Sequence, residues 1–385
     1  MTPVAAPHGA STAPADDLSV PGTTAAAGLA ARTETTLEPV RAIIPAKCYE
    51  RSTIRGLAHV GLAVVIYALL IWGLAITDNP FAVVGLWLVS FMSLSSLFVL
   101  GHDAAHGALF DSKRMNGIIG RGLMLPTMHV YEAWVLGHNR IHHGHTVRQG
   151  MDFVWHPVTA EEYRAFNRYQ RLQHRVEWSF LGAGAYYMRN VWWHKMMRFD
   201  PPEKFAKAIR KDWWLVMVGG SIVVAAAGAY GWSHYGTVLG VIWTIVKLVV
   251  IPTLGFMQVI GWTVHVHHVS PEIRWWPRRE WNKFRGQMEG TTVLRFNPVL
   301  DWLFFHHIFV HVPHHVDMRI PFYELPRAAK AIEEAYPGVI IDKKFKVRDY
   351  LHAAGTCKLY DFEVGTWLPY SAANEAPASS STATA

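Results

Sequence analysis

Cysteine is nearly absent from this sequence, which has only Cys48 and Cys357 among 385 residues. Two distant cysteines exclude a disulfide framework and form no metal or redox motif. The sequence also lacks a dinucleotide-binding fingerprint, a cysteine cluster for an iron–sulfur centre, and a His-Pro-Gly-Gly haem segment. Any redox chemistry of this chain therefore needs electrons from another protein.

Neither end of the sequence has the long apolar or periodic segments that predict packed structure. Residues 1–40 are rich in Ala, Pro, Thr, Ser and Gly, with no basic start and no apolar run of a signal peptide. We expect 1–40 to be a disordered tail, and we expect the same of the final residues, ANEAPASSSTATA. We take 41–350 as one domain and 351–385 as a C-terminal segment.

Four apolar runs are long enough to cross a bilayer, which takes about 20 residues. Short turns join them in pairs and predict two helical hairpins, with spans at about 57–76, 81–100, 213–232 and 236–262. Lys247 and Pro252 in the fourth run predict a kink or a tilted, partly protein-facing helix. The apolar segment 117–137 is broken by Arg121 and Pro126, so we expect it to be interfacial or buried.

Basic residues are almost excluded from these four runs, where Lys247 is the only one of 36 Lys and Arg residues. Both hairpin turns lack them as well. The positive-inside rule therefore places both termini and the long middle segment in the cytoplasm, and we expect a multi-pass protein of a bacterial cytoplasmic membrane. This orientation, together with anionic lipid headgroups, accounts for the net charge of +7, so nucleic acid is not expected as a partner.

Histidine is abundant, with 22 copies, and many of them gather at the cytoplasmic ends of the expected spans. Spacings of three or four residues place histidines on a common helix face, and His143 is about 100° away from the face of His138 and His142. These clusters could together hold more than one metal ion. They comprise His102 and His106; His138, His142 and His143; His265, His267 and His268; and His306, His307, His311, His314 and His315.

The number of histidines narrows the choice of metal. A zinc site closes with four ligands and has no redox chemistry, and a haem needs single histidines rather than crowded ones. Soluble di-iron bundles use Glu-x-x-His pairs, and no Glu in this chain has a His three residues later. A two-iron centre surrounded by histidines fits best.

The chain resembles the membrane-bound fatty acid desaturase family, which has three histidine boxes. HDAAH (102–106), HNRIHH (138–143) and HVPHH (311–315) are similar to the first, second and third box. Trp134, four residues before the second box, and Pro321 and Tyr323 after the third are similar to the acyl-lipid Δ12/ω-6 branch. The resemblance covers roughly residues 50–330.

In that branch the fourth span ends in a Gln-His pair with a Pro three residues after the His. His268 and Pro271 match, but His267 stands where Gln is usual, so the extra ligand is His265, His267 or His268, with His268 as the matching position. Asp103, Asp152 and Asp317 are candidates to hydrogen-bond the ligand imidazoles. The resemblance implies these metal ligands: His102, His106, His138, His142, His143, His268, His311, His314 and His315. We do not expect ligation by the neighbouring His129, His145, His156, His306 and His307.

The resemblance also implies a fold and a reaction. The fold is an all-α integral membrane protein, with four spans under a cytoplasmic helical cap that holds two non-haem irons. The reaction uses O2 and two electrons to insert a cis double bond into a fatty acyl lipid. The branch favours a monounsaturated substrate and a diene product, and an external ferredoxin or cytochrome b5 type protein supplies the electrons.

Two other functions compete with this interpretation. Hydroxylases and ketolases of carotenoids, alkanes, sterols or fatty acids share the boxes and differ in the product. A non-enzymatic membrane protein that binds or carries metal is the second alternative. A carrier places ionisable groups near the middle of the bilayer, whereas these spans contain almost none.

Overall fold

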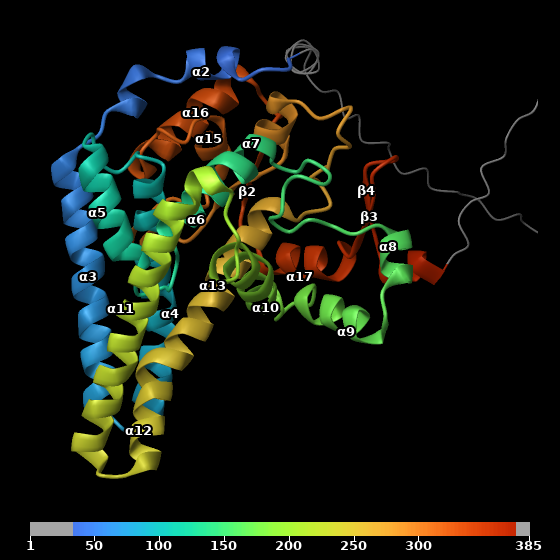
Figure 1. Ribbon diagram of the computed structural model, residues 1–385. Helices are drawn as coiled ribbons and strands as arrows, with labels where there is room; N and C mark the ends of the chain where they lie inside the picture. The colour runs from blue at the N-terminus through green and yellow to red at the C-terminus, as the bar shows by residue number, and fades with distance from the viewer. Residues whose placement is uncertain (1–33, 375–385) are drawn as a thin grey trace, which may run out of the picture.

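A computed structural model describes residues 34–374 of the chain (Figure 1). Most of the two tails predicted from composition, 1–33 and 375–385, lies outside the described residues. The end of the predicted N-terminal tail is helical instead, because α2 (Glu38–Ile43) begins there and buries Val40 in the hydrophobic core. The apolar residues Leu37, Val40 and Ile44 recur at helical spacing and hold this segment on the protein.

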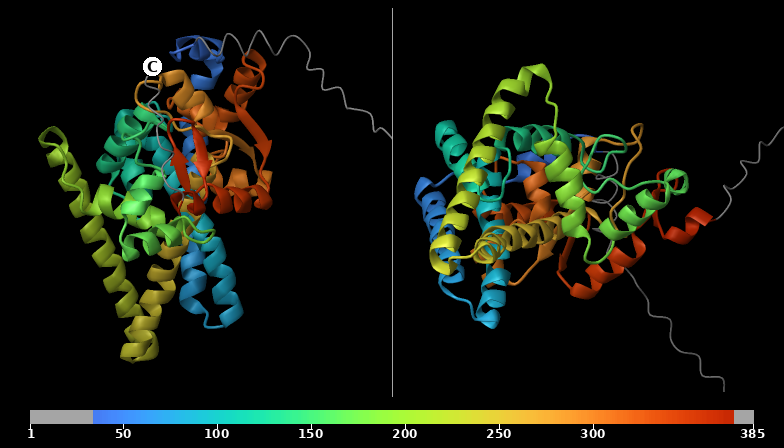
Figure 2. Two further views of the ribbon diagram at one scale, coloured as in Figure 1. Left: turned by 90° about the vertical axis from the view of Figure 1, so that its right-hand side faces the viewer. Right: turned by 60° about the horizontal axis from the view of Figure 1, so that its bottom comes forward.

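Four helices are long and apolar enough to cross a membrane, as expected. The first hairpin consists of α3 (Thr53–Ile76) and α4 (Pro80–Ala105), and the second of α11 (Glu203–Tyr235) and the helix Val238–His268. Figures 1 and 2 show both hairpins projecting from the same side of a larger body, which contains the rest of the described chain. The chain is therefore a mostly helical membrane protein with a polar cap.

The helices extend beyond the apolar runs at the end nearest the cap. All four continue past the predicted boundaries: α3 from Thr53, α4 to Ala105, α11 from Glu203, and the fourth span to His268. An apolar run marks only the part of a helix that lipid surrounds, whereas intrahelical hydrogen bonds continue wherever the cap supplies packing. These extensions bring His102 and His268 into the cap on continuous helices.

The fourth span has the irregularity that Lys247 and Pro252 predicted, in the form of a π-helical turn, η4 (Val246–Val250). This turn separates α12 (Val238–Ile245) from α13 (Ile251–His268). The Lys247 side chain is buried, and Nζ donates hydrogen bonds to Thr77 O at 3.1 Å and Asp78 Oδ1 at 2.9 Å in the turn of the first hairpin. Lys247 thus ties the two hairpins together at the end far from the cap.

Replacing Asp78 by Ala should lower the stability of the detergent-solubilised protein by about 1–3 kcal/mol, because a buried ammonium loses its charged partner. The measurement is the thermal unfolding midpoint. Lys247→Met is the matched control and should cost less, since it removes the buried charge itself and Tyr235 still donates to Asp78 at 2.6 Å. A larger loss in Lys247→Met than in Asp78→Ala would contradict this account of the ion pair.

The cap consists of short helices, many of them one or two turns long. The segment 117–137 does not span, as expected: it divides into α5 (Lys113–Met124), α6 (Tyr131–Trp134) and the start of a π-helix, with a break near Pro126. The remaining helices are η1 (Ala46–Tyr49), η2 (Val135–His142), α7 (His143–His145), α8 (Ala160–Ala165), α9 (Arg168–Glu177), α10 (Ala183–Tyr186), η3 (Tyr187–Met197), η5 (Arg285–Glu289), α14 (Pro298–Leu300), η6 (Asp301–Phe305), α15 (His311–Val316), η7 (Phe322–Glu324), α16 (Leu325–Ala335), α17 (Val347–Thr356) and η8 (Tyr370–Asn374).

Four short strands in the cap were not predicted. β1 (Thr292–Arg295) pairs in parallel with β2 (Ile341–Lys344), with Thr292 opposite Ile341. β3 (Leu359–Asp361) pairs antiparallel with β4 (Thr366–Leu368). At three or four residues each, these strands are too short for an alternating pattern to show in the sequence. The Leu294 N–H of β1 also donates to Phe309 O at 2.9 Å, just before α15, so the first sheet helps to hold the third histidine box in place.

Candidate metal centre

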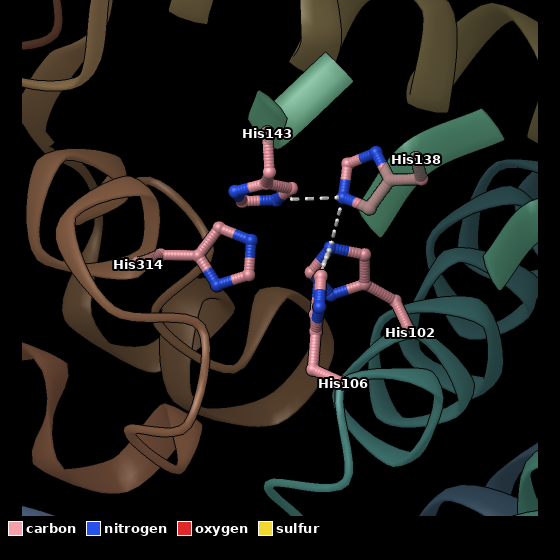
Figure 3. Close-up of side chains that lie close together, drawn as sticks. All are labelled: His102, His106, His138, His143 and His314. Carbon is pink, nitrogen blue, oxygen red and sulfur yellow. Dashed lines mark hydrogen bonds between the residues drawn. The ribbon is translucent and has the colours of Figure 1, made fainter. Parts of the chain in front are cut away.

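Five histidines from three separate parts of the chain converge on one point in the cap (Figure 3). Each offers a ring nitrogen, and these nitrogens all lie within 4.8 Å of one another. All are buried except His106, which is partly buried. We call this set, His102 and His106 of α4, His138 of η2, His143 of α7 and His314 of α15, the first histidine group.

The ring nitrogens of the first group face one another rather than other polar partners. His138 Nε2 lies 2.8 Å from His102 Nε2 and 3.1 Å from His143 Nε2, and His106 Nε2 lies 3.2 Å from His102 Nε2. Both ring nitrogens of His314 are buried without a hydrogen-bond partner. Unpaired buried polar atoms cost free energy, and a cation that takes the lone pairs removes this cost. The donor set therefore fits a metal ion.

The second histidine box is not α-helical, although its spacing had suggested an α-helix. Residues 135–142 form the π-helix η2, in which hydrogen bonds connect residues five apart. The rings of His138 and His142 still stack, with 5.2 Å between centroids, so these two side chains lie side by side. Their nitrogens nevertheless belong to different groups, because His138 converges with His143 in the first group and His142 does not.

His142 belongs to a second histidine group, together with His268 of α13 and His315 of α15. In each of these residues Nδ1 donates a hydrogen bond away from the group: His142 to Asp152 Oδ1 at 2.9 Å, His268 to Gly290 O at 3.0 Å, and His315 to Gln287 Oε1 at 2.8 Å. With the proton on Nδ1, the Nε2 lone pair of each ring is free to bind a cation. His315 Nε2 is indeed buried without a partner.

Of the three histidines at the end of the fourth span, only His268 joins a group of converging nitrogens. The His267 ring stacks on His311 at 3.9 Å, and the His265 ring packs edge-on against Trp155 at 4.6 Å. His311, the first histidine of the third box, lies outside both groups. Its ring is next to the second group, 4.6 Å from His315 and 5.4 Å from His268 between centroids.

The three aspartates near the boxes differ in what they contact. Asp152 accepts from His142 and also from the amides of Val147 and Val154, which fix its carboxylate. Asp103 instead accepts from the Phe322 amide. Asp317 forms ion pairs with Arg319 and Arg41 and accepts from Tyr49. Of the three, Asp152 alone is placed to orient a histidine of either group.

Gln287 contacts a histidine of each group, and the sequence did not predict this role. It is buried in η5, its side-chain oxygen accepts from His315, and its Nε2 donates to the carbonyl oxygen of His143 at 2.8 Å. It therefore holds one histidine from each group. Gln287 is far from every box in the chain, so spacing alone offered no signal for it.

Replacing Gln287 by Leu should lower metal affinity or activity by about 10–100-fold, the usual effect of losing an outer hydrogen-bond partner of a metal ligand. The reason is that His315 loses the acceptor that fixes its tautomer and ring orientation. Gln287→Glu, which keeps an acceptor for His315, is the control and should retain more metal. Metal content per polypeptide measures both, and equal metal in Gln287→Leu and wild type would contradict this role.

Burial keeps these histidines neutral. Burial, with a smaller contribution from neighbouring imidazoles, holds the pKa of His138, His143, His314 and His315 well below the usual value. A neutral imidazole has a lone pair to give to a metal, and a protonated one does not. The five nearby histidines expected not to be ligands, His129, His145, His156, His306 and His307, lie outside both groups.

A small, mostly apolar cavity of about 40 Å³ borders both groups. Its walls include His102, His138 and His268, with Phe98 and Val99 of α4 and Ile260 of α13. The site therefore places buried, neutral, metal-competent nitrogens beside a narrow apolar space.

The family model for fatty acid desaturases matches residues 77–341, more than two-thirds of the chain. The chain belongs to the fatty acid desaturase family. The expected resemblance is thereby confirmed, and the match includes all three histidine boxes and the fourth span. A fatty acid desaturase is an oxidoreductase, so the alternative of a non-enzymatic metal carrier is wrong.

Curated relatives are similar over most of this desaturase. It is 26% identical over 338 residues to an sn-1 oleoyl-lipid 12-desaturase of Anabaena variabilis, covering 86% of this chain and 92% of that one. It is 26% identical over 336 residues to a chloroplastic omega-6 fatty acid desaturase of Glycine max, covering 86% and 74%. An sn-1 acyl-lipid omega-3 desaturase (ferredoxin) of Synechocystis is 29% identical over 308 residues, covering 77% and 80%.

Proposed function

We propose that this desaturase inserts a second double bond into a monounsaturated acyl chain of a membrane lipid, at a centre of two non-haem irons. The observation that carries the proposal is the pair of histidine groups side by side. His143 of the first group stacks on His315 of the second, with 4.3 Å between ring centroids. Two ions in adjacent groups suit a reaction in which a metal pair activates O2.

Each ion has its own set of side chains in this proposal. The first histidine group would hold one iron, and the second group together with His311 would hold the other. Asp152, Gln287 and the Gly290 carbonyl fix the second set through Nδ1. When bound, the iron pair supplies the oxidising power that removes hydrogen from an unactivated C–H bond.

The protein's own part is to position the substrate and to exclude water. The cavity beside the histidines would hold the reacting carbons, because apart from the histidines most of its walls are apolar and suit a hydrocarbon chain. Fixing the chain there places one pair of carbons next to the metals. The supporting histidines act by holding the ions, and none of them is assigned a nucleophilic or acid–base role.

The names of the relatives support the proposed lipid substrate and the proposed electron donor. Two of the relatives are named as acting on acyl groups in lipids, and one carries ferredoxin in its name. We propose a ferredoxin or cytochrome b5 type donor that docks on the cap, which faces the cytoplasm by the positive-inside rule.

The purified protein with NAD(P)H alone should be inactive, and added ferredoxin with its reductase should start turnover at a rate that falls as salt rises. Turnover without any carrier would contradict this.

The fatty acid methyl esters of a host that expresses the chain test the function. The proposal predicts new dienes derived from the host's monoenes. New monoenes from saturated chains would move the protein to another branch of the family. A hydroxylated or keto product would assign it to the oxygenating relatives of the superfamily.

A further inference from the structure

Two cavities follow one another along the same helices. The small cavity beside the histidines is lined by Phe98 of α4 and Ile260 of α13. A second cavity, of about 760 Å³, is lined one turn earlier on these helices by Leu94 and Met257. Moving along α4 and α13 away from the cap, one passes from the first cavity to the second. We call them the histidine cavity and the deep cavity.

Four buried aromatic rings pack together beside these cavities: Phe98, His129, Tyr187 and Phe256, each at most 2% exposed. The His129 ring lies 4.6 Å from Phe98 and 5.6 Å from Phe256, and Phe98 lies 5.6 Å from Phe256. Phe98 and Tyr187 line the histidine cavity, while Met128, Met188 and Met257, the chain neighbours of His129, Tyr187 and Phe256, line the deep one. These linings place the four rings between the two cavities, and we call them the partition.

The partition contains a hydrogen bond in otherwise apolar surroundings. His129 Nδ1 donates to Thr127 O at 2.7 Å, so Nε2 accepts from the Tyr187 hydroxyl at 2.9 Å. Burial lowers the pKa of His129 to about 3, so the ring is neutral. A fully paired polar group in a core fixes ring positions more strictly than apolar packing does.

The backbone that carries His129 is strained. Met128 has a φ of +57°, a left-handed conformation that a non-glycine residue seldom adopts, and the Trp192 indole N–H holds it by donating to Met128 O at 2.8 Å. Such strain tends to occur where a side chain must be placed for function. The metal centre does not account for it, because His129 lies outside both histidine groups.

The depth of the deep cavity in the membrane indicates which end of an acyl chain meets the partition. Pro252, in the lining of the deep cavity, is ten residues from Trp262, where the apolar run of the fourth span ends at the cap. This separation is about 15 Å along a helix, half of a hydrocarbon core of about 30 Å. The deep cavity therefore lies near the middle of the bilayer, where the methyl ends of lipid acyl chains lie. An acyl chain that enters from the cap and passes the histidines points its methyl end at the partition.

We propose that the partition, and the His129–Tyr187 pair in particular, stops the methyl end of the acyl chain and so determines which carbons lie beside the metals. These residues are specificity-determining and take no part in the chemistry. The inference rests on the proposed desaturase function. It predicts that the enzyme counts carbons from the methyl end, because the stop is fixed relative to the histidines.

The test compares Tyr187→Ala, which opens the partition into the deep cavity, with Tyr187→Phe, which keeps the ring. Phe256→Leu is a milder opening for the case in which Tyr187→Ala fails to fold. Each variant is expressed in a host that supplies sixteen- and eighteen-carbon monoenes, and mass spectrometry of derivatised methyl esters locates the new double bonds. The opening variants should shift the bond by at least about one carbon toward the carboxyl end, or spread it over several positions, since an apolar site discriminates a single methylene only weakly. Tyr187→Phe should keep the wild-type position.

The wild-type protein alone already decides between the main outcomes. A new bond at a constant distance from the methyl end in both chain lengths supports the proposal. A constant distance from the carboxyl end overturns it, as do active Tyr187→Ala or Phe256→Leu variants with an unchanged bond position. If the wild type forms no double bond at all, the desaturase function has failed, and that result is distinct from a failure of the partition.

Discussion

His314→Ala is expected to reduce desaturation by more than about 100-fold while the protein still inserts in the membrane. Loss of an outer partner of a metal ligand already costs about 10–100-fold, and His314 offers two buried, unpaired nitrogens to the first histidine group. The apolar helices suffice for insertion without this side chain. Product yield and metal content, measured together, should both fall.

The same loss is expected for the other box histidines, which are His102, His106, His138, His142, His143, His311 and His315. The control is His234→Ala, because His234 is exposed in the last turn of α11, at the end of this helix far from the cap. Its product yield should equal that of the wild type. Full activity and normal metal in His314→Ala or His142→Ala would show that the two groups do not hold the catalytic metals.

The second large effect concerns the histidine at the end of the fourth span. His268→Ala should behave like a box variant and lose metal, because the His268 Nδ1 proton is bound to Gly290 O and its Nε2 lies within the second group. His265→Ala is the matched control on the same helix. Its ring contacts Trp155 and Tyr350, and its loss should lower stability without removing metal.

His267→Ala should give an intermediate result. The His267 ring stacks on His311, next to the second group. Its loss therefore removes a packing contact of His311 but no histidine of either group. We expect reduced activity with most of the metal retained. If His267→Ala loses metal as completely as a box variant while His268→Ala keeps it, the extra ligand is His267, and the assignment from the converging nitrogens is wrong.

Much of the fold could be predicted from the sequence because lipid imposes a simple rule. A run of about 20 apolar residues must form a spanning helix, and the two hairpins followed directly. The ends of these helices could not be predicted in the same way. The start of α11 at Glu203 and the end of α13 at His268 depend on packing within the cap, which apolar content does not record.

The metal centre was predictable as a set of residues but not as two groups. The boxes gave eight histidines, and the end of the fourth span gave a choice of three. Spacing placed His138 and His142 side by side, and their rings do stack, yet their nitrogens belong to different groups. That division depends on how α4, α13 and α15 pack around η2, and spacing within the box does not record such packing.

The supporting contacts were predictable only where they lie close in the chain. Asp152 is ten residues from His142 and was expected beside it. Gln287 and the Gly290 carbonyl reach the second group from η5 and the residue after it, far from every box in the chain. Contacts between distant segments leave no periodic pattern in the sequence, so they can be identified only from the structure.

The central claim is tested most directly by the metal content per polypeptide of the active, membrane-extracted protein. Elemental mass spectrometry measures this content. The two histidine groups predict two irons per chain in preparations that desaturate lipid, and about one or none in His268→Ala and His314→Ala. A fully active wild-type preparation with a single metal ion, or with a metal other than iron, would contradict a centre of two irons held by these histidines.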